Sequence, residues 1–389
     1  MLRSRFLPLF VLLCCGTIIP ARAAGPFRFP EKKHGKGELK YVNGLPLLVL
    51  SGTPEEMGEA AGVLAVKPAT KVLDYPRGVM DYYSAGLFWN VVLSQGRDMV
   101  KHFPTAYRDE MESLVKASGA PRDKIVVGNT LFDIKKIVLC SALMIEGDRS
   151  ATSGPLLGRN LDYPSLGYVH EYSLVTVFRP RGKHAFVSLG FPGLIGSLSG
   201  MNDAGLTVAV LEVMASRSGE GRFDPKGIPY ALCFRTLLEE CTTIEEAKKK
   251  LEKLPRTTLL NMVVADRNKV GTFEITPKSV VFRPAEKGVC SCTNHFCTDL
   301  KPEKPENRIN ICRTYDRFKL LESVRGGKER VSVENVRKHL DAVNLGTLTL
   351  QTMVFEPATL KLHVSFSDGP ASRLPLRTLE LASLLQKSD

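Results

Sequence analysis

Beyond its first residues, the sequence has no apolar run long enough to span a bilayer, and it has no internal repeat and no long linker. A spanning helix needs about 20 predominantly apolar residues, and no stretch after residue 23 supplies them. The composition also lacks the bias of collagen-like or disordered chains. We therefore expect a soluble mature protein, and a chain of 389 residues is long enough to bury a full core.

The first 23 residues have the pattern of a secretory signal peptide. Arg3 and Arg5 precede the apolar run FLPLFVLLCCGTIIP, and Ala21 and Ala23 place small residues at a cleavage site. We predict that residues 1–23 are removed and that the mature protein is secreted or periplasmic. The chain has no N-x-S/T sequon, so glycosylation gives no support for a eukaryotic secretory route. This favours a bacterial periplasm.

Acidic residues are fewer than basic ones, and the net charge is +12. Removal of residues 1–23 takes away three arginines and no acid, which leaves +9. The excess is spread over several segments and interleaved with acids, which is typical of a solvated surface rather than a nucleic-acid groove. We expect no nucleic-acid partner, while an anionic substrate or surface stays open.

Helical periodicity dominates from about residue 53 to residue 118. Thr53 is placed to cap the first helix, with Pro54 in its first turn and Glu56 three residues after the cap. From residue 137 onward the pattern is mostly short strands bounded by turn residues. Further helices are predicted at 229–240, 243–254, 310–324 and 332–342. Helices that are grouped rather than alternating with strands predict an α+β layered fold.

Cys140 lies inside the apolar stretch VLCSALMI. Free cysteine is usually buried, so a structural role is the first interpretation. The later stretch GRNLDY changes it, because an antiparallel return strand brings Arg159 and Asp162 near the thiol, and a neighbouring Arg lowers a thiol's pKa. If Cys140 is an N-terminus, its α-amine, with an unperturbed pKa of about 7.7–8.0, is a general base near working pH. Asp162 can hold that amine in position.

The stretches CSALMIEG and GRNLDY, followed by GMNDAGLTVAV and CTNHF, resemble the motifs of the cysteine N-terminal-nucleophile (Ntn) hydrolases. The segment before Cys140 and the closing TLQTMVFEPATLKLHVSFSDGP are most similar to the autoproteolytic isopenicillin N acyltransferase branch, related to choloylglycine hydrolases and penicillin V acylases. The resemblance implies a four-layer αββα sandwich of antiparallel sheets. It also implies cleavage between Leu139 and Cys140, which gives a mainly helical small chain (24–139) and a large chain (140–389) with the Ntn-hydrolase core.

The resemblance assigns catalytic roles by position. Cys140 matches the nucleophile, Arg159 the arginine beside it, and Asp162 the aspartate that binds the α-amine. Asn294 in CTNHF matches an asparagine associated with the oxyanion site. Arg313 falls near a family arginine that supports the nucleophile.

Two other arginines, Arg308 and Arg317, are close to Arg313 in the sequence and compete for that match. Glu212 stands where the family often has an Asn or Tyr oxyanion donor. An ionised Glu cannot donate a hydrogen bond, so either backbone N–H groups do that work or Glu212 contacts substrate. Asn202, in the sequence NDAG, fits a turn between strands, with substrate binding as its alternative.

The cysteines do not form a recognisable metal motif. Seven remain after residue 23, an odd number, and export allows disulfides. Cys290, Cys292, His295 and Cys297 are enough soft ligands for zinc, but the spacing is C-x-C rather than C-x2-C. We predict disulfides or core packing there, with no metal and no cofactor. Cys140 also lacks the local signature of papain-like enzymes, which argues against a Cys/His protease.

The resemblance implies an enzyme that cleaves a small-molecule N-acyl amide through a Cys140 thioester, which passes to water or to an amine acceptor. We expect hydrolysis, because water is abundant outside the cytoplasm and acyl-CoA is not expected there. The alternatives are an esterase acting on lipid acyl groups with the same fold, and an exported binding protein without catalysis. The sequence does not indicate an oligomeric state.

Overall fold

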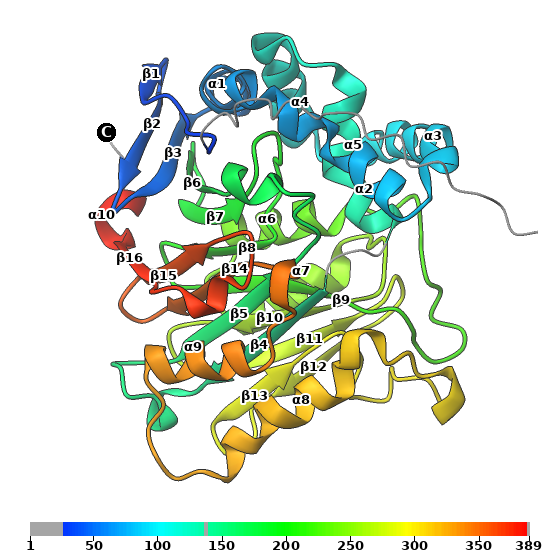
Figure 1. Cartoon of the computed structure of the whole chain (residues 1–389), viewed down its shortest axis with the longest axis vertical. Coiled ribbons are helices and arrows are strands. Elements are labelled where there is room, and N and C mark those ends of the chain that lie inside the picture. Colours follow the sequence, from blue (N-terminus) through cyan, green and yellow to red (C-terminus); the bar gives the residue numbers. More distant parts are fainter. Residues whose placement is uncertain (1–25, 136–138, 387–389) are drawn as a thin grey trace, which may run out of the picture.

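Two β-sheets form the centre of the computed structural model, which describes residues 26–135 and 139–386 (Figure 1). The ten-stranded sheet contains, in spatial order, β1 (Lys32–His34), β2 (Gly37–Val42), β3 (Leu45–Gly52), β6 (Leu174–Pro180), β7 (Phe186–Gly190), β8 (Ser199–Asn202), β9 (Thr207–Glu212), β10 (Leu260–Ala265), β11 (Val270–Ile275) and β12 (Val280–Pro284). The six-stranded sheet contains β13 (Val289–Cys292), β4 (Leu139–Ile145), β5 (Leu156–Asp162), β14 (Thr349–Glu356), β15 (Lys361–Phe366) and β16 (Arg377–Glu380).

Helices cover both outer faces of this pair of sheets. In the described ranges the α-helices are α1 (Pro54–Ala61), α2 (Tyr75–Tyr82), α3 (Trp89–Val100), α4 (Thr105–Ser118), α5 (Arg122–Ile134), α6 (Tyr230–Glu240), α7 (Ile244–Lys253), α8 (Thr314–Glu322), α9 (Val333–Ala342) and α10 (Leu381–Leu385).

The layers follow from which elements touch. The sheets pack face to face, with β4 against β9 and β5 against β10. Helices α8 and α9 pack on the outer face of the six-stranded sheet, against β13, β4, β5 and β14. Helix α6 packs against β8 and β9, and α7 against β12, on the other sheet. The order of helices, sheet, sheet and helices confirms the predicted four-layer αββα sandwich (Figure 1).

Alternation along β4 divides its side chains between two cores. Successive side chains of a strand point to opposite faces of a sheet. Cys140 and Ala142 belong to the large core between the sheets. Leu143 and Ile145 belong to a second core that contains Val336 of α9. Cys140 is therefore on the inner face of its strand, with no exposed surface.

The segment before Cys140 contains three strands in addition to the predicted helices. Strands β1 to β3 precede the first helix, and β3 pairs in parallel with β6 of the large-chain segment. The other strand pairs of the described ranges are antiparallel. Leu45 to Leu50 form a nearly continuous apolar run, as expected for a buried strand in a parallel pair. The predicted small chain is thus mainly helical but shares a sheet with the rest.

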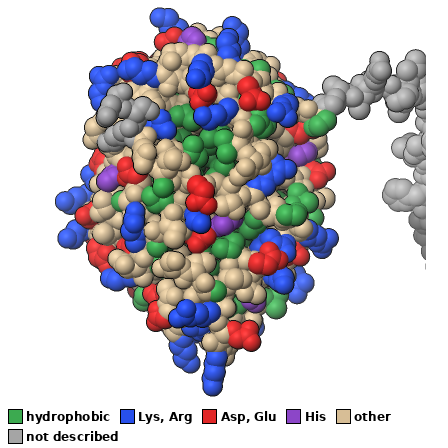
Figure 2. All heavy atoms as spheres, turned by 90° about the vertical axis from the view of Figure 1, so that its left-hand side faces the viewer, with side chains coloured by type: hydrophobic (Ala, Val, Ile, Leu, Met, Phe, Trp, Pro, Cys, Tyr) green, Lys and Arg blue, Asp and Glu red, His purple; other side chains and the backbone are tan. Residues whose placement is uncertain are grey.

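The surface mixes charges of both signs. On the face in Figure 2, Lys and Arg side chains are interspersed with Asp and Glu. This agrees with the interleaved charges of the sequence. No helix within residues 26–135 and 139–386 is both long enough and apolar enough to cross a membrane.

Candidate active site

Strands β4 and β5 hold the central residues of the candidate site. They pair antiparallel, with Ala142 opposite Arg159 and Leu139 opposite Asp162. Residues that face each other across a ladder share a face, so Arg159 lies on the inner face with Cys140. Asp162 lies on the opposite face, across from the residue that precedes Cys140. The predicted return strand is therefore confirmed. It places the Arg159 guanidinium and the Asp162 carboxylate on opposite faces of the sheet.

Arg159 contacts the thiol directly. Its Nη2 donates to Cys140 Sγ at 2.7 Å, and its Nη1 donates to Leu198 O at 3.3 Å and to Ser199 Oγ on β8. Burial raises the pKa of the Cys140 thiol to about 11, against the opposing charge of Arg159. Arg159 lowers the thiol pKa as expected, but burial raises it by more. At neutral pH the thiol is protonated and needs a base to become a nucleophile.

Asp162 has one oxygen bound and one without a hydrogen bond. Thr349 Oγ1 donates to Asp162 Oδ1 at 2.5 Å, and the nearest cation, Arg317 Nη1, is 3.9 Å from Oδ2. Oδ2 is buried and has no hydrogen-bond donor among the described residues. Burial raises the pKa of Asp162 to about 6, opposed by Arg317. A buried carboxylate oxygen without a partner can accept a hydrogen bond from a donor that comes within reach.

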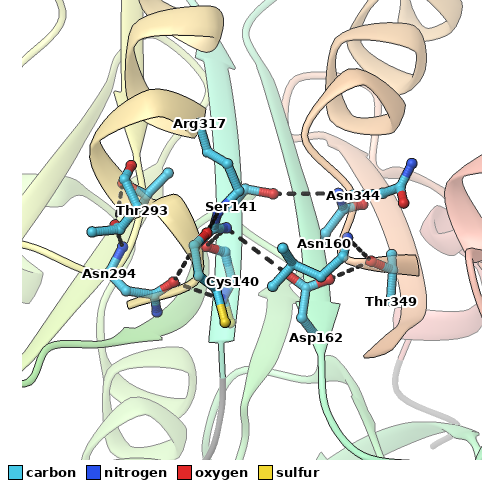
Figure 3. Close-up of polar contacts among 12 residues, drawn as sticks. Cys140, Ser141, Asn160, Asp162, Thr293, Asn294, Arg317, Asn344 and Thr349 are labelled. Atoms are coloured by element: carbon cyan, nitrogen blue, oxygen red, sulfur yellow. Dashed lines mark hydrogen bonds and ion pairs between the residues drawn. The ribbon is translucent and has the colours of Figure 1, made fainter. Parts of the chain in front are cut away.

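Asn294, in the loop after β13, holds the main chain of Cys140 (Figure 3). Its Oδ1 accepts from Cys140 N at 3.1 Å and from Arg317 Nη2 at 2.9 Å, and its Nδ2 donates to Glu212 O at 2.9 Å. Two donors at Oδ1 fix the orientation of the amide. For the second N–H of Nδ2, no acceptor is found among the described residues.

Arg317 on α8, rather than Arg313, reaches the nucleophile. Arg317 Nη1 donates to Cys140 O at 2.8 Å, and its Nε donates to Cys312 O at 3.0 Å. The Arg313 side chain is 81% exposed and pairs with Asp316. The sequence assignment of Arg313 is therefore wrong. The chain enters α8 through two left-handed residues, Cys312 (φ 43°) and Arg313 (φ 55°), which leave Arg313 outside while Arg317, one turn later, points inward.

Thr314 ties the Asn294 loop to the first turn of α8. Asn294 N donates to Thr314 Oγ1 at 2.9 Å, Thr314 Oγ1 donates to Thr293 Oγ1 at 3.0 Å, and Thr293 Oγ1 donates to Thr314 O at 3.0 Å. This network sets Asn294 and Arg317 relative to each other. Sequence reasoning misses Thr314 and Thr349, because no local pattern distinguishes them from other threonines.

Glu212 ends β9 with its side chain fully buried. Burial is the main cause of the raised pKa values of the Cys140 thiol and of the Tyr163 and Tyr230 hydroxyls, and the charge of Glu212 adds to each. Its backbone carbonyl orients Asn294. A contact between Glu212 and substrate stays a prediction.

Asn202 is a structural turn residue. Its Nδ2 donates to Leu238 O at 2.9 Å and to Cys241 O at 2.7 Å, and its Oδ1 accepts from Ala204 N and Leu206 N. Both ends of the amide are fully engaged between β8, β9 and the end of α6. The turn interpretation is confirmed, and the substrate-binding alternative is wrong.

The cysteine-rich segment packs in the core. All seven described cysteines are free, and Cys290 and Cys292 of β13 are buried in the large core. Cys290 Sγ accepts from Arg283 Nη1 at 3.6 Å. Burial lowers the pKa of His295 to about 4, so its imidazole is neutral at pH 7. Within the described ranges, no group of three or more His, Cys, Asp or Glu is arranged to hold a metal ion.

An apolar cavity of about 290 Å³ lies beside the bond predicted to be cleaved. It is lined by Val79, Met80, Tyr83, Ala85, Leu131, Lys135, Leu139, Met214 and Ile311. Leu139 is the residue before Cys140. Leu139 therefore lies between this apolar space and the residue that carries the buried thiol.

Residues 149–370 match the model of the family described as acyl-coenzyme A:6-aminopenicillanic acid acyl-transferase. The match covers more than half of the chain and includes Arg159, Asp162, Asn294 and Arg317, and it begins after Cys140. The chain belongs to this family. It is thereby a member of the Ntn-hydrolase superfamily, as its motifs indicate.

Three known proteins of related sequence or structure are distant from this chain. The acid ceramidase of Balaenoptera acutorostrata scammoni is 24% identical over 206 residues, which are 48% of this chain and 51% of that protein. A variant of conjugated bile acid hydrolase from Clostridium perfringens is 17% identical with a TM-score of 0.47, covering 63% of this chain and 93% of that one. Penicillin V acylase from Agrobacterium tumefaciens is 17% identical with a TM-score of 0.41, covering 59% and 84%. The chain spans about half the length of the curated relatives it matches.

Proposed function

We propose that the protein is an exported, autoproteolytic Ntn amidase that hydrolyses an N-acyl amide with Cys140 as its N-terminal nucleophile. The observation that carries the proposal is the buried Oδ2 of Asp162, which lies across the ladder from Leu139 and has no hydrogen-bond donor among the described residues. Cleavage before Cys140 replaces one amide N–H with an amine that has additional donors. One of these can bind Asn294 Oδ1, as the amide does now, and another can bind Asp162 Oδ2.

Processing uses the same thiol as catalysis. Cys140 Sγ attacks the carbonyl carbon of Leu139, the C–N bond breaks, and the nitrogen takes the thiol proton. Water then hydrolyses the Leu139 thioester, which frees the thiol and leaves a carboxylate on Leu139. Arg317 holds Cys140 O at 2.8 Å and Arg159 holds Sγ at 2.7 Å, so the backbone and the thiol of Cys140 are both fixed.

Amide cleavage by the mature site needs a base for a thiol whose pKa is about 11 in the uncut chain. The α-amine of Cys140 takes this role, since its unperturbed pKa of about 7.7–8.0 keeps part of it unprotonated at neutral pH. Sγ attacks the substrate carbonyl, and the second N–H of Asn294 Nδ2 stabilises the oxyanion. A preorganised donor of this kind contributes about 10²–10³-fold in rate. The amine then protonates the leaving nitrogen, and water hydrolyses the thioester.

The family and the sequence relatives support acyl chemistry without naming this substrate. Their descriptions are an acyl-transferase and a ceramidase. The pattern of residues 1–23 supports export, and an extracytoplasmic location favours water over acyl-CoA as the second reactant. The apolar cavity beside Leu139 favours an apolar acyl group.

Intact mass spectrometry tests the proposal. Purified wild-type protein should give two fragments, with Leu139 as a new C-terminus and Cys140 as a new N-terminus. Cys140→Ala should give one uncut chain. Cys312→Ala, which removes an exposed thiol of the same segment as Arg317, is the matched control and should be processed like wild type. A single uncut chain that is fully active would overturn the autoproteolytic part.

The esterase alternative differs in the bond that is cleaved. A series of N-acyl-4-nitroanilides and the matching 4-nitrophenyl esters, assayed with processed protein, separates the two. We expect kcat/KM to rise with acyl chain length for the anilides and to vanish in Cys140→Ala. Turnover of the esters alone would assign the protein to the esterases, and no turnover of either, with no labelling of Cys140 by iodoacetamide, would assign it to the binding proteins.

A further inference from the structure

Five of the eight exposed large hydrophobic side chains in the described ranges gather at one place. Tyr82, Tyr83, Leu87, Phe88 and Val91 are 64%, 51%, 95%, 55% and 52% exposed. They span the end of α2, the 3-10 turn Gly86–Phe88 and the start of α3. Single exposed hydrophobic residues are ordinary, whereas a contiguous apolar patch marks an interaction site. We call residues 82–91 the apolar crest.

The crest is free of charge over an unusual length. Residues 82–96 contain no Asp, Glu, Lys, Arg or His, although exposed surface is ordinarily about one quarter to one third charged. Trp89 of the crest and the following Leu93 pack on buried Met80 and Val92. The crest therefore rests on a packed hydrophobic cluster.

The chain around the crest carries a small excess of basic residues, although Arg77 and Lys101 pair with Asp81 and Asp98. Residues 67–101 contain five Lys and Arg against three Asp and no Glu. Lys135 Nζ lies 5.4 Å from the centre of the Phe88 ring, and the Arg77 guanidinium lies 5.6 Å from that of Trp89. One cation therefore lies near each of these two rings. This is the charge sign that anionic lipid headgroups attract.

We propose that the apolar crest docks on the surface of a lipid bilayer that contains anionic lipid. A Leu87 side chain that is 95% exposed projects from the protein, which suits insertion at the boundary of headgroups and acyl chains. Tyr, Trp and Phe beside it are the residues that concentrate at that boundary. A protein partner instead needs about one hydrogen bond per 100–200 Å² of interface, and the crest offers few polar side chains. In Figure 1, α3 lies at the outer edge of the molecule.

The crest also borders the apolar cavity beside Leu139. Tyr83 and Ala85 line the apolar cavity that reaches Leu139, and Ile311 lines it too. A bilayer bound at the crest would therefore lie at the cavity, and a lipophilic amide could pass from one to the other. This link rests on the proposed function, whereas docking does not.

The single tryptophan of the chain makes the test direct. Mature protein is mixed with vesicles of phosphatidylcholine and phosphatidylglycerol, and Trp89 emission and sedimentation with the vesicles are measured. We expect a shift of the emission to shorter wavelength and cosedimentation. The double variant Leu87→Ser/Phe88→Ser should bind at least tenfold more weakly, about 1.4 kcal/mol, with an unchanged thermal midpoint, because both side chains are exposed.

Two further variants separate the possible outcomes. Leu374→Ser alters an exposed leucine outside the crest and should bind like wild type. Cys140→Ala should also bind like wild type, so a failure of the proposed catalysis leaves docking intact. Absence of cosedimentation, or equal binding by the double variant, would overturn the proposal. So would a lipid-free dimer that dissociates in the double variant, because the crest would then be a contact between copies.

Discussion

At the scale of single residues, buried charged groups surround Cys140, and they differ in how completely they are hydrogen-bonded. Arg159 and Arg317 are bound to its sulfur and its carbonyl oxygen. Asp162 is fully buried with an incomplete set of hydrogen bonds. Buried charges are costly unless they are paired and hydrogen-bonded. The carboxylate is therefore the group whose environment processing would change most.

The first prediction concerns the pH dependence of stability in the uncut chain. Burial raises the pKa of Asp162 from 3.8 to about 6, so between these values the native state binds more protons than the unfolded state. Stability from this group is present below the unfolded pKa and lost as the pH rises through the folded pKa, by up to about 3 kcal/mol. Urea unfolding of Cys140→Ala at pH 4 and pH 7, with and without Asp162→Asn, should show that loss only when Asp162 is present. Equal pH dependence in both would contradict it.

The second prediction separates the two arginines of the α8 region. Arg317→Met removes the donors to Cys140 O and Asn294 Oδ1, and should slow processing by about 10²-fold. Arg313→Met removes only a surface pair with Asp316 and should process within about twofold of wild type. The half-time of fragment formation on denaturing gels gives both values. Similar rates for the two variants would refute the assignment of Arg317.

At the scale of elements, the contact between the loop after β13 and the start of α8 sets the geometry of the site. Thr314→Val keeps the shape of the side chain but leaves Asn294 N without its acceptor, which should cost about 1–3 kcal/mol in the free energy of unfolding. Processing should slow as well, because Asn294 and Arg317 lose their common support. Thr314→Ser keeps the hydroxyl and should retain most of the stability and most of the processing rate. Urea unfolding and gels measure the effects, and a Val variant no worse than Ser would show that the hydroxyl does not position the loop.

The elements that can be predicted from the sequence are those with local signals. The capping box of Thr53 and Glu56 is present, and β4 and β5 form the predicted antiparallel pair. Strands β1 to β3 are joined by short turns, with Asn43 and Gly44 between β2 and β3, and this local hairpin signal is not used in the sequence prediction. The parallel pairing of β3 with β6, more than 100 residues later, has no local signature. Sequence position favours Arg313 over Arg317, but two left-handed residues that are not glycine set the start of α8. The Asp162 carboxylate is predictable, whereas its bond to Thr349 depends on tertiary packing.

At the scale of the whole molecule, the two predicted chains are built into one body. Strand β3 of the small chain lies inside the ten-stranded sheet beside β6. Glu110 of α4 accepts two hydrogen bonds from Arg235 of α6, at 2.8 and 2.6 Å, and both side chains are at most 2% exposed. Arg235 also donates to Glu239 at 2.8 Å. Cleavage at Leu139 breaks none of these contacts, so the fragments should stay together.

The last prediction follows from this buried ion pair. Processed protein should elute in gel filtration with uncut Cys140→Ala, although denaturing gels show two chains. Glu110→Gln leaves Arg235 with a single carboxylate partner in a buried site and should lower the stability of the assembly by about 3–5 kcal/mol, so that the small chain is released at lower urea. Glu112→Gln, which alters an exposed pair with Arg122, should change it by less than about 1 kcal/mol. Separation of the wild-type fragments in native buffer would show that the shared sheet and this pair do not hold the chains together.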